Sequence, residues 1–194
     1  ISSTINKYTY IIIREIKRIH DYKFRLRYFK NEEVKSFRNI KHGPYREIIK
    51  NLNLQNQPLE VVYTADLPAM SGLGSSSSST VGMINACTAI KKGIIGKKKL
   101  AKDALNIERK ILKEKVGCQD QIAAAFGGFN KISFNANDFR VEPFNNLKNI
   151  NILNNHCVLY FTGLQRIASS IESRKIIGIN QKKNLEKLKI ISSI

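Results

Sequence analysis

The run PAMSGLGSSSSST, residues 68–80, has the residue types of a loop that binds an anion. Pro68 fixes the entry of the turn, and Gly72 and Gly74 permit backbone angles that other residues avoid. These glycines also carry no side chain that would keep a ligand away. The serines after Gly74 stand where a helix is expected to begin, with free backbone N–H groups and the positive end of the helix dipole. This combination predicts a phosphate site.

The spacing in this loop excludes three other functional motifs. No Lys follows Gly74, as a Walker A loop requires, and Ser77 stands where a dinucleotide fingerprint has its third glycine. No glycine lies two residues beyond any of the serines, as a nucleophile elbow requires. A flexible Gly/Ser linker remains as the alternative. It is disfavoured because linkers seldom lie directly between an apolar strand and a buried helix.

A single acidic residue occupies an unusual position on a predicted helix. The apolar spacing predicts a helix over about residues 97–113, on which Glu108 follows Ala101 and Leu105 and precedes Leu112. Its carboxylate therefore belongs to the packed face, where a charge is seldom found. The plain alternative to a functional role is an internal salt bridge with one of the many lysines, since buried carboxylates are commonly paired.

The charge balance is strongly basic, with 33 Lys and Arg against 15 Asp and Glu and a formal net charge of +18. Such a charge favours anionic partners in general. Here Lys, Ile and Asn are all used heavily and the lysines are scattered, so the charge reflects a general residue bias. Nucleic acid is not the expected partner, because basic charge alone cannot specify it. A nucleotide or a sugar phosphate would benefit from the same field.

The cysteines and histidines form no metal or disulfide pattern. The cysteines are odd in number and far apart, at Cys87, Cys118 and Cys157. They support neither a disulfide framework nor a zinc site, and a reducing cytoplasm is expected. The histidines, His20, His42 and His156, have no catalytic spacing and are expected at the surface or in the core. No apolar run approaches the roughly 18 residues that span a bilayer, so no membrane partner is expected.

Periodicity predicts the elements that position the loop and Glu108. Alternating residues predict a strand over 22–28, with residues 9–13 as its partner, and an apolar strand over 59–64 leads into the loop. The predicted helices cover about residues 43–52, 80–90, 97–113 and 122–126, the last stopped by Gly127 and Gly128. A hairpin is expected over 129–144, a strand over 157–161 and a helix from 168 onward. Strands and helices without strict βαβ alternation predict an α+β fold.

The loop residues Pro68, Gly72, Leu73, Gly74, Ser75 and Ser76 resemble the signature loop of the GHMP kinases, with Ser77 and Ser78 as its small continuation. Within that superfamily, three blocks resemble the D-glycero-D-manno-heptose 7-phosphate kinases, in the expected order and through nearly the whole chain. The blocks are DLPAMSGLGSSSSSTVGMINA, VGCQDQIAAAFGGFNKISF and YFTGLQRIASSI.

The resemblance implies a role for each site residue. The loop would wrap the phosphates of ATP through Pro68, Ser71, Gly72, Leu73, Gly74, Ser75, Ser76 and Ser77. Ser76 and Glu108 would bind Mg²⁺, for which hydroxyl and carboxylate oxygens are suitable ligands. Asp120 would be the general base, with a plain helix N-cap as the alternative. Arg166 would clamp the sugar 7-phosphate, with a solvated loop arginine as the alternative.

The resemblance also implies the domain organisation. Residues 1–152 would form a GHMP kinase N-terminal domain with a ribosomal-protein-like βα fold, and residues 153–194 the start of a ferredoxin-like C-terminal domain, with the boundary near residues 151–156. The chain opens at Ile1 and closes without a tail. We therefore expect a fragment that lacks the family's first glycine-rich sugar-binding segment and its second glycine-rich loop.

The implied reaction transfers the γ-phosphoryl group of ATP to a heptose 7-phosphate, at the anomeric hydroxyl. Another GHMP kinase, of the galactokinase or fucokinase type, is the nearest alternative. A basic, non-catalytic RNA-binding domain of the same fold is an alternative of another class, which aromatic or Arg/Lys clusters on one sheet face would favour. The residues do not predict an oligomeric state.

Overall fold

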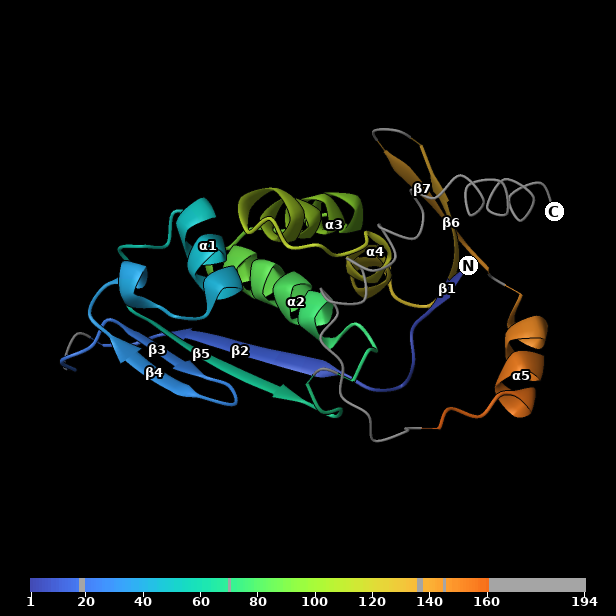
Figure 1. Cartoon of the computed structure of the whole chain (residues 1–194), viewed down its shortest axis with the longest axis horizontal. Coiled ribbons are helices and arrows are strands. Elements are labelled where there is room, and N and C mark those ends of the chain that lie inside the picture. The colour runs from blue at the N-terminus through green and yellow to red at the C-terminus, as the bar shows by residue number, and fades with distance from the viewer. Residues whose placement is uncertain (18–19, 70, 136–137, 145, 161–194) are drawn as a thin grey trace.

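The computed structural model describes residues 1–17, 20–69, 71–135, 138–144 and 146–160. In this part of the chain a mixed sheet carries helices on one face, and a smaller sheet lies beyond the helices (Figure 1). This architecture of mixed helices and strands confirms the predicted α+β class.

The larger sheet has the strand order β2-β5-β3-β4. Its strands are β2 (Thr9–Glu15), β3 (Phe24–Arg27), β4 (Asn31–Val34) and β5 (Leu59–Ala65). β5 pairs antiparallel with β2 and parallel with β3. The strands themselves are confirmed, but the predicted pairing of residues 9–13 with 22–28 is wrong. The more apolar β5, whose first three residues are buried, takes the central place between them, because a central strand is covered most completely.

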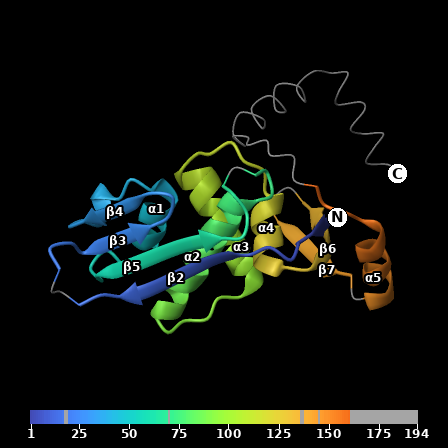
Figure 2. The same ribbon diagram turned by 90° about the horizontal axis from the view of Figure 1, so that it is seen from below.

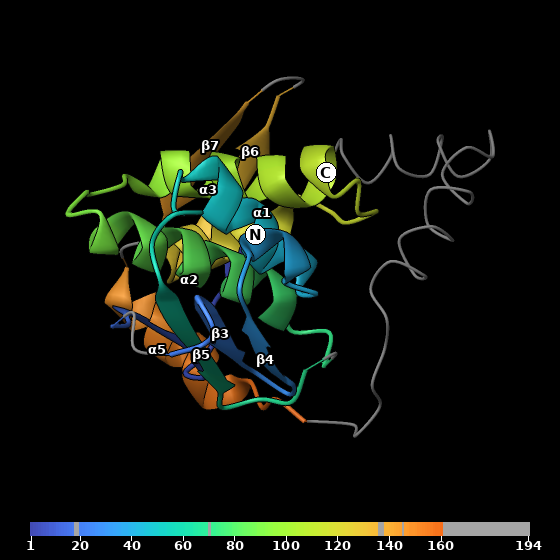
Figure 3. The same cartoon turned by 90° about the vertical axis from the view of Figure 1, so that its left-hand side faces the viewer.

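The helices lie on one face of this sheet, with α2 (Ser75–Ile90) against β2 and both α1 (Gly43–Asn51) and α3 (Lys97–Leu105) packed against α2 (Figure 3). A short 3₁₀ turn, η1 (Phe37–Asn39), precedes α1. The core between the layers includes Phe24, Leu26, Ile48 and Met83, all at most 1% exposed. α2 approaches β2 so closely that a Cβ on Gly82 would lie 2.9 Å from Cγ1 of Ile11. The opposite face of the sheet is not covered by these helices (Figure 2).

The smaller sheet has the order β1-β6-β7 and confirms the predicted hairpin. Its strands are β1 (Ser2–Ser3), β6 (Phe129–Phe134) and β7 (Phe139–Pro143). Helix α4 (Gln119–Phe126) precedes β6 and packs against α2 and α3. α4 ends at Gly127, whose φ of +66° is in the left-handed region that favours glycine.

The helix predicted over residues 97–113 is formed, but its last part is not α-helical. α3 continues into a π-helical turn, η2 (Asn106–Ile111). This turn adds a residue to the helical repeat, so the side chains beyond it move to other faces. Ile111 is 36% exposed, whereas Leu112, which the helical period predicted on the packed face, packs against the core.

The last described segment differs most from the sequence prediction. Helix α5 (Leu147–His156) contains the predicted domain boundary at residues 151–156. The predicted strand at 157–161 is wrong over residues 157–160, which have no regular structure. Val158, Leu159 and Tyr160 are 74%, 60% and 82% exposed, so this segment has no sheet to pair with in the described chain. Residue 161, Arg166 and the helix predicted from residue 168 lie outside the described residues.

Candidate active site

The predicted phosphate loop joins the end of β5 to the start of α2. At its entry, the carboxylate of Asp66 accepts a 2.8 Å hydrogen bond from the backbone N–H of Tyr8, and the Asp66 N–H donates to the Tyr8 carbonyl at 2.9 Å. Gly72 and Gly74 have φ angles of +77° and +74°. Both glycines are therefore required by the backbone conformation, as the sequence predicted.

The serine run forms the first turn of α2, a 16-residue helix. Gly74 occupies the N-cap position and offers no side chain to cap the first N–H groups. Those N–H groups have no acceptor within the helix, and the dipole adds positive charge at this end. Ser75 is half-buried, Ser76 is exposed and Ser77 is buried. This geometry suits an anion and differs from that of a flexible linker.

Glu108 is buried behind this turn, with 1% of its surface exposed. Its Oε2 atom accepts a 3.2 Å hydrogen bond from the Ser77 hydroxyl and a second from Nε2 of Gln121. Its Oε1 atom is buried and has no hydrogen-bond partner among the described residues. No Lys or Arg in the described ranges forms an ion pair with Glu108, so the salt-bridge alternative finds no support there.

Glu108 lies within the π-helical turn η2. The N–H of Leu112 donates to the carbonyl of Ile107, five residues earlier, and the N–H of Glu114 donates to the carbonyl of Glu108. Such turns occur often at functional sites. Glu114 is half-buried near Glu108, and burial and the charge of Glu108 together raise the pKa of Glu114. Two acidic side chains, Glu108 and Glu114, therefore lie close together behind the loop.

Asp120 lies in the first turn of α4 and is exposed. The N-cap of α4 is Cys118, so Asp120 is not the cap that the alternative interpretation required. A Cβ built on Gly74 would lie 3.5 Å from Oδ2 of Asp120. The carboxylate predicted to be the base is thus in contact with the loop predicted to hold the phosphates.

The other residues predicted for the site differ in burial and in whether they contact Glu108. Ser76, predicted to bind metal together with Glu108, is exposed, and the serine that contacts Glu108 is Ser77. In the loop, Pro68 and Leu73 are exposed, whereas Ser71 has a buried Oγ with no partner among the described residues. Arg166 lies outside the described residues.

Gln121 is the residue of this site that the sequence interpretation missed. It is 1% exposed and its Oε1 atom, like that of Glu108, is buried without a described partner. A signal was present, because Gln121 precedes Ala125 by four residues and so shares the packed face of α4. A polar side chain on a packed helix face is expected to have a hydrogen-bond partner.

The metal prediction fits the donors that are present. Among the described residues no three His, Cys, Asp or Glu side chains form a metal-binding group. Mg²⁺ does not need one, because it is commonly held by one or two carboxylates together with substrate phosphates and water. Oε1 of Glu108 is a hard oxygen donor without a described hydrogen-bond partner and lies beside the predicted phosphate loop. It therefore suits Mg²⁺ held jointly by a carboxylate and substrate phosphates.

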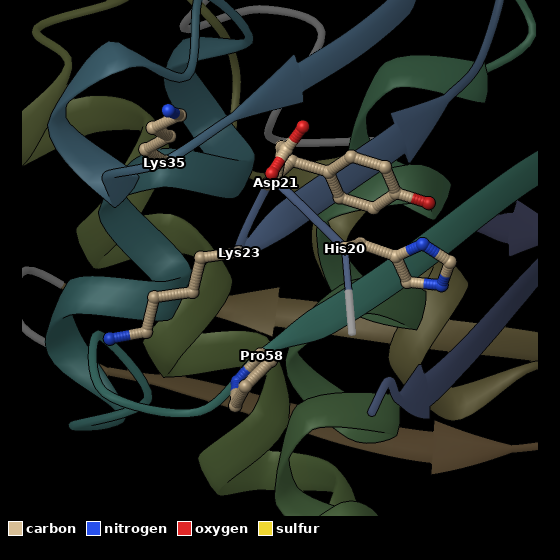
Figure 4. A pocket seen from close by; sticks show the side chains of 6 residues that line it. His20, Asp21, Lys23, Lys35 and Pro58 are labelled. Atoms are coloured by element: carbon tan, nitrogen blue, oxygen red, sulfur yellow. The ribbon is translucent and has the colours of Figure 1, made fainter. Parts of the chain in front are cut away.

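A separate hollow of about 390 Å³ opens at the other end of β5 (Figure 4). It is lined by His20, Asp21, Tyr22, Lys23, Lys35 and Pro58. Pro58 precedes β5 and the glycine loop follows β5, so the length of the strand, about 20 Å, separates the hollow from the loop.

Two of the three histidines have local structural contacts. His20 stacks on Tyr22, and His42 caps α1 through Nδ1, which accepts from the N–H of Tyr45. Burial lowers the pKa of His42.

Comparison with known proteins identifies the class. Residues 40–128 match the family described as GHMP kinases N terminal domain. The chain therefore contains a GHMP kinase N-terminal domain. No helix in the described ranges is long and apolar enough to cross a membrane.

Two of the matched proteins are named as kinases of heptose phosphates. A D-glycero-alpha-D-manno-heptose 7-phosphate kinase of Campylobacter jejuni is 36% identical over 149 residues, which cover 76% of this chain and 44% of that protein. The crystal structure of a D-glycero-D-manno-heptose 1-phosphate kinase from Bacteroides thetaiotaomicron matches with a TM-score of 0.64 and 31% identity, over 73% of this chain and 49% of the other. A mevalonate kinase structure, 18% identical with a TM-score of 0.55, shares the fold. The chain spans about half the length of these relatives.

Proposed function

We propose that this chain carries the ATP-binding part of a GHMP-type sugar kinase, a phosphotransferase that moves the γ-phosphoryl group of ATP to a sugar hydroxyl. The observation that carries the proposal is the convergence of three elements. The glycine loop, the buried Glu108 and the exposed Asp120 meet at the N-terminus of α2. Membership of the GHMP kinase domain family supports ATP as the donor.

The mechanism follows from what phosphoryl transfer requires, which is alignment, neutralisation of charge and a place for one proton. The N–H groups of the first turn of α2 would hold the phosphates, and the left-handed Gly72 and Gly74 let the backbone approach them. Glu108, with Ser76 or Ser77, would hold Mg²⁺, which supplies positive charge beside the phosphates when bound. The carboxylate of Asp120 would accept the proton of the attacking hydroxyl.

For the acceptor we propose D-glycero-D-manno-heptose 7-phosphate, phosphorylated at its anomeric hydroxyl. The support is that two relatives at 36% and 31% identity are both named as kinases of heptose phosphates, although their names differ in the phosphate position. Arg166 remains the proposed clamp for the sugar phosphate. Another GHMP sugar kinase, such as a galactokinase or fucokinase type, is the nearest alternative acceptor class.

A non-catalytic RNA-binding role is the second candidate, and one observation favours it. Arg14, Arg25 and Arg27 gather around Glu60 in the larger sheet, where the strand register sets Arg14 and Arg25 on either side of it. All three form ion pairs with Glu60, which is 5% exposed, and Arg25 also pairs with Glu33. These carboxylates offset much of the cationic charge, so the kinase remains the better supported function.

The decisive test replaces Asp120 by Asn in the full-length protein. The amide keeps the shape but cannot take a proton, so kcat should fall by about two to four orders of magnitude. The KM for ATP should change little, because the loop is untouched, and the sugar phosphate should still bind in calorimetry. The matched control is Asp103→Asn, which removes only an exposed ion pair with Lys99. If Asp120→Asn turned over within a few-fold of the parent, Asp120 would not be the base.

A further inference from the structure

The side chain of Gln121 is hydrogen-bonded to Glu108 at the buried end of the site. It lies in the first turn of α4, directly after Asp120, and 1% of its surface is exposed. Its Nε2 donates to Oε2 of Glu108, and the same oxygen accepts from the hydroxyl of Ser77 in α2. The carboxylate of Glu108, carried by the π-helical turn, is therefore held by one donor from each neighbouring helix.

Both of these donors are neutral and both act on the same carboxylate oxygen. Neither donor carries a charge, so neither offsets the negative charge of a carboxylate. A Lys or Arg at position 121 would hold the carboxylate equally well but would cancel that charge, and would compete with any cation. The choice of an amide therefore orients Glu108 without neutralising it.

The other carboxylate oxygen of Glu108, Oε1, accepts no hydrogen bond from the described residues. Oε1 of Glu108 is buried, as is Oε1 of Gln121, and neither has a hydrogen-bond partner among the described residues. Buried polar atoms nearly always have a hydrogen-bond partner. Two buried oxygens without one, on side chains that are hydrogen-bonded to each other, therefore need an explanation. An arrangement that serves only stability would satisfy both oxygens, as happens at other buried carboxylates of this chain.

We infer that Gln121 is a positioning residue, which fixes the carboxylate of Glu108 through Oε2 so that Oε1 remains available to a divalent cation. The inference rests on the proposed function. Residues that hydrogen-bond to metal ligands commonly contribute 10- to 100-fold to metal affinity. Because Gln121 is the neighbour of Asp120, the same hydrogen bond also fixes the first turn of α4 relative to the metal carboxylate.

The experiment compares Gln121→Met with Gln119→Met in the full-length protein. Met preserves the length of the side chain and its helix propensity but cannot donate a hydrogen bond. Gln119 lies on the same helix and is exposed, so it is the matched control. The readout is binding of Mn²⁺ in the presence of a non-hydrolysable ATP analogue, measured by electron paramagnetic resonance, together with the melting temperature of each protein.

We expect Gln121→Met to weaken Mn²⁺ binding by about 10- to 100-fold, with the control within twofold of the parent. Gln121→Asn, whose shorter amide cannot reach Oε2, should give a loss in the same direction and serves if the Met variant does not fold. Mn²⁺ affinity within twofold of the parent for the folded variants would overturn the inference. Failure of the parent protein to bind Mn²⁺ with the nucleotide would instead refute the proposed function.

Discussion

Glu32 and Glu108 are both buried carboxylates, at 7% and 1% exposure, but their surroundings differ in kind. Glu32, in β4, accepts hydrogen bonds from the hydroxyl of Tyr28 at 2.6 Å and from the backbone N–H groups of Lys41 and His42 at 2.6 and 3.1 Å. These three bonds use both of its oxygens. Glu108 accepts two bonds, both on Oε2, and its Oε1 has no described partner.

This difference in hydrogen bonding distinguishes Glu32, whose two oxygens both have partners, from Glu108, whose Oε1 could still bind a ligand. Glu32 ties β4 to the segment that enters α1, since Lys41 and His42 directly precede that helix. Burial alone would raise the pKa of Glu32, but the bonds from Tyr28, Lys41 and His42 outweigh it and lower the pKa. Glu60, with three arginines around it, is satisfied in another way. Hydrogen bonds to both oxygens suit a stabilising role, whereas the oxygen of Glu108 that has no described partner suits the proposed role as a metal ligand.

The largest effect that this comparison predicts is on activity, in Glu108→Gln. The substitution removes the charge but keeps the shape, so turnover should fall by about 100-fold or more and the Mg²⁺ concentration for half-maximal rate should rise. The melting temperature should stay the same or rise, because a buried charge without a described counter-ion is removed. A steady-state titration with Mg²⁺ and a thermal melt measure both quantities. A large loss of stability with normal Mg²⁺ dependence would make Glu108 structural.

The reverse pattern is expected for Glu32→Gln. An amide cannot accept all three hydrogen bonds as a carboxylate does, so the free energy of unfolding should fall by about 1–3 kcal/mol. Because Glu32 lies in β4 and not at the loop, kcat and the KM for ATP should remain those of the parent. Urea denaturation and initial rates give the two numbers. Altered Mg²⁺ dependence in this variant would remove the distinction between the two carboxylates.

The pH dependence of the Glu32 contribution gives a smaller, graded effect. Its pKa is lowered by folding from the ordinary value of 4.5, so the folded state favours the ionised form. The stability that it contributes is therefore fully present above pH 4.5 and is lost as the pH falls through the lower folded-state pKa. The difference in unfolding free energy between parent and Glu32→Gln should shrink in urea melts from pH 7 to pH 3. A constant difference would contradict the assignment.

The smallest effect is expected at an exposed carboxylate in the same sheet. Glu33 pairs with Arg25 at 2.8 Å, but its side chain is 47% exposed. Such surface pairs contribute about 0–1 kcal/mol, so Glu33→Gln should change the urea midpoint only slightly. The stability change of Glu33→Gln is therefore the reference against which those of Glu32→Gln and Glu108→Gln are compared. A loss as large as that of Glu32→Gln would show that burial is not what distinguishes them.

Much of this site could be predicted from local patterns. The positive φ angles of Gly72 and Gly74, the helix that starts in the serine run and the burial of Glu108 all follow from residue types and spacing within one segment. The π-helical turn could not be predicted, because it depends on the packing of α3 against its neighbours. Beyond Glu108, Ile111 is 36% exposed, whereas Leu112 packs against the core as the helical period predicted.

The sequence by itself determined the loop, the position of its helix and the acidic residues that could serve chemistry, because these depend on backbone preferences and on a helical period. Only the tertiary structure decided which side chains meet. It brought Asp120 against Gly74 and paired Glu108 with Ser77 and Gln121, across 31 and 13 residues of sequence. It also inserted β5 between β2 and β3. Such contacts are set by the joint burial of several elements in one core, and no single segment contains that information.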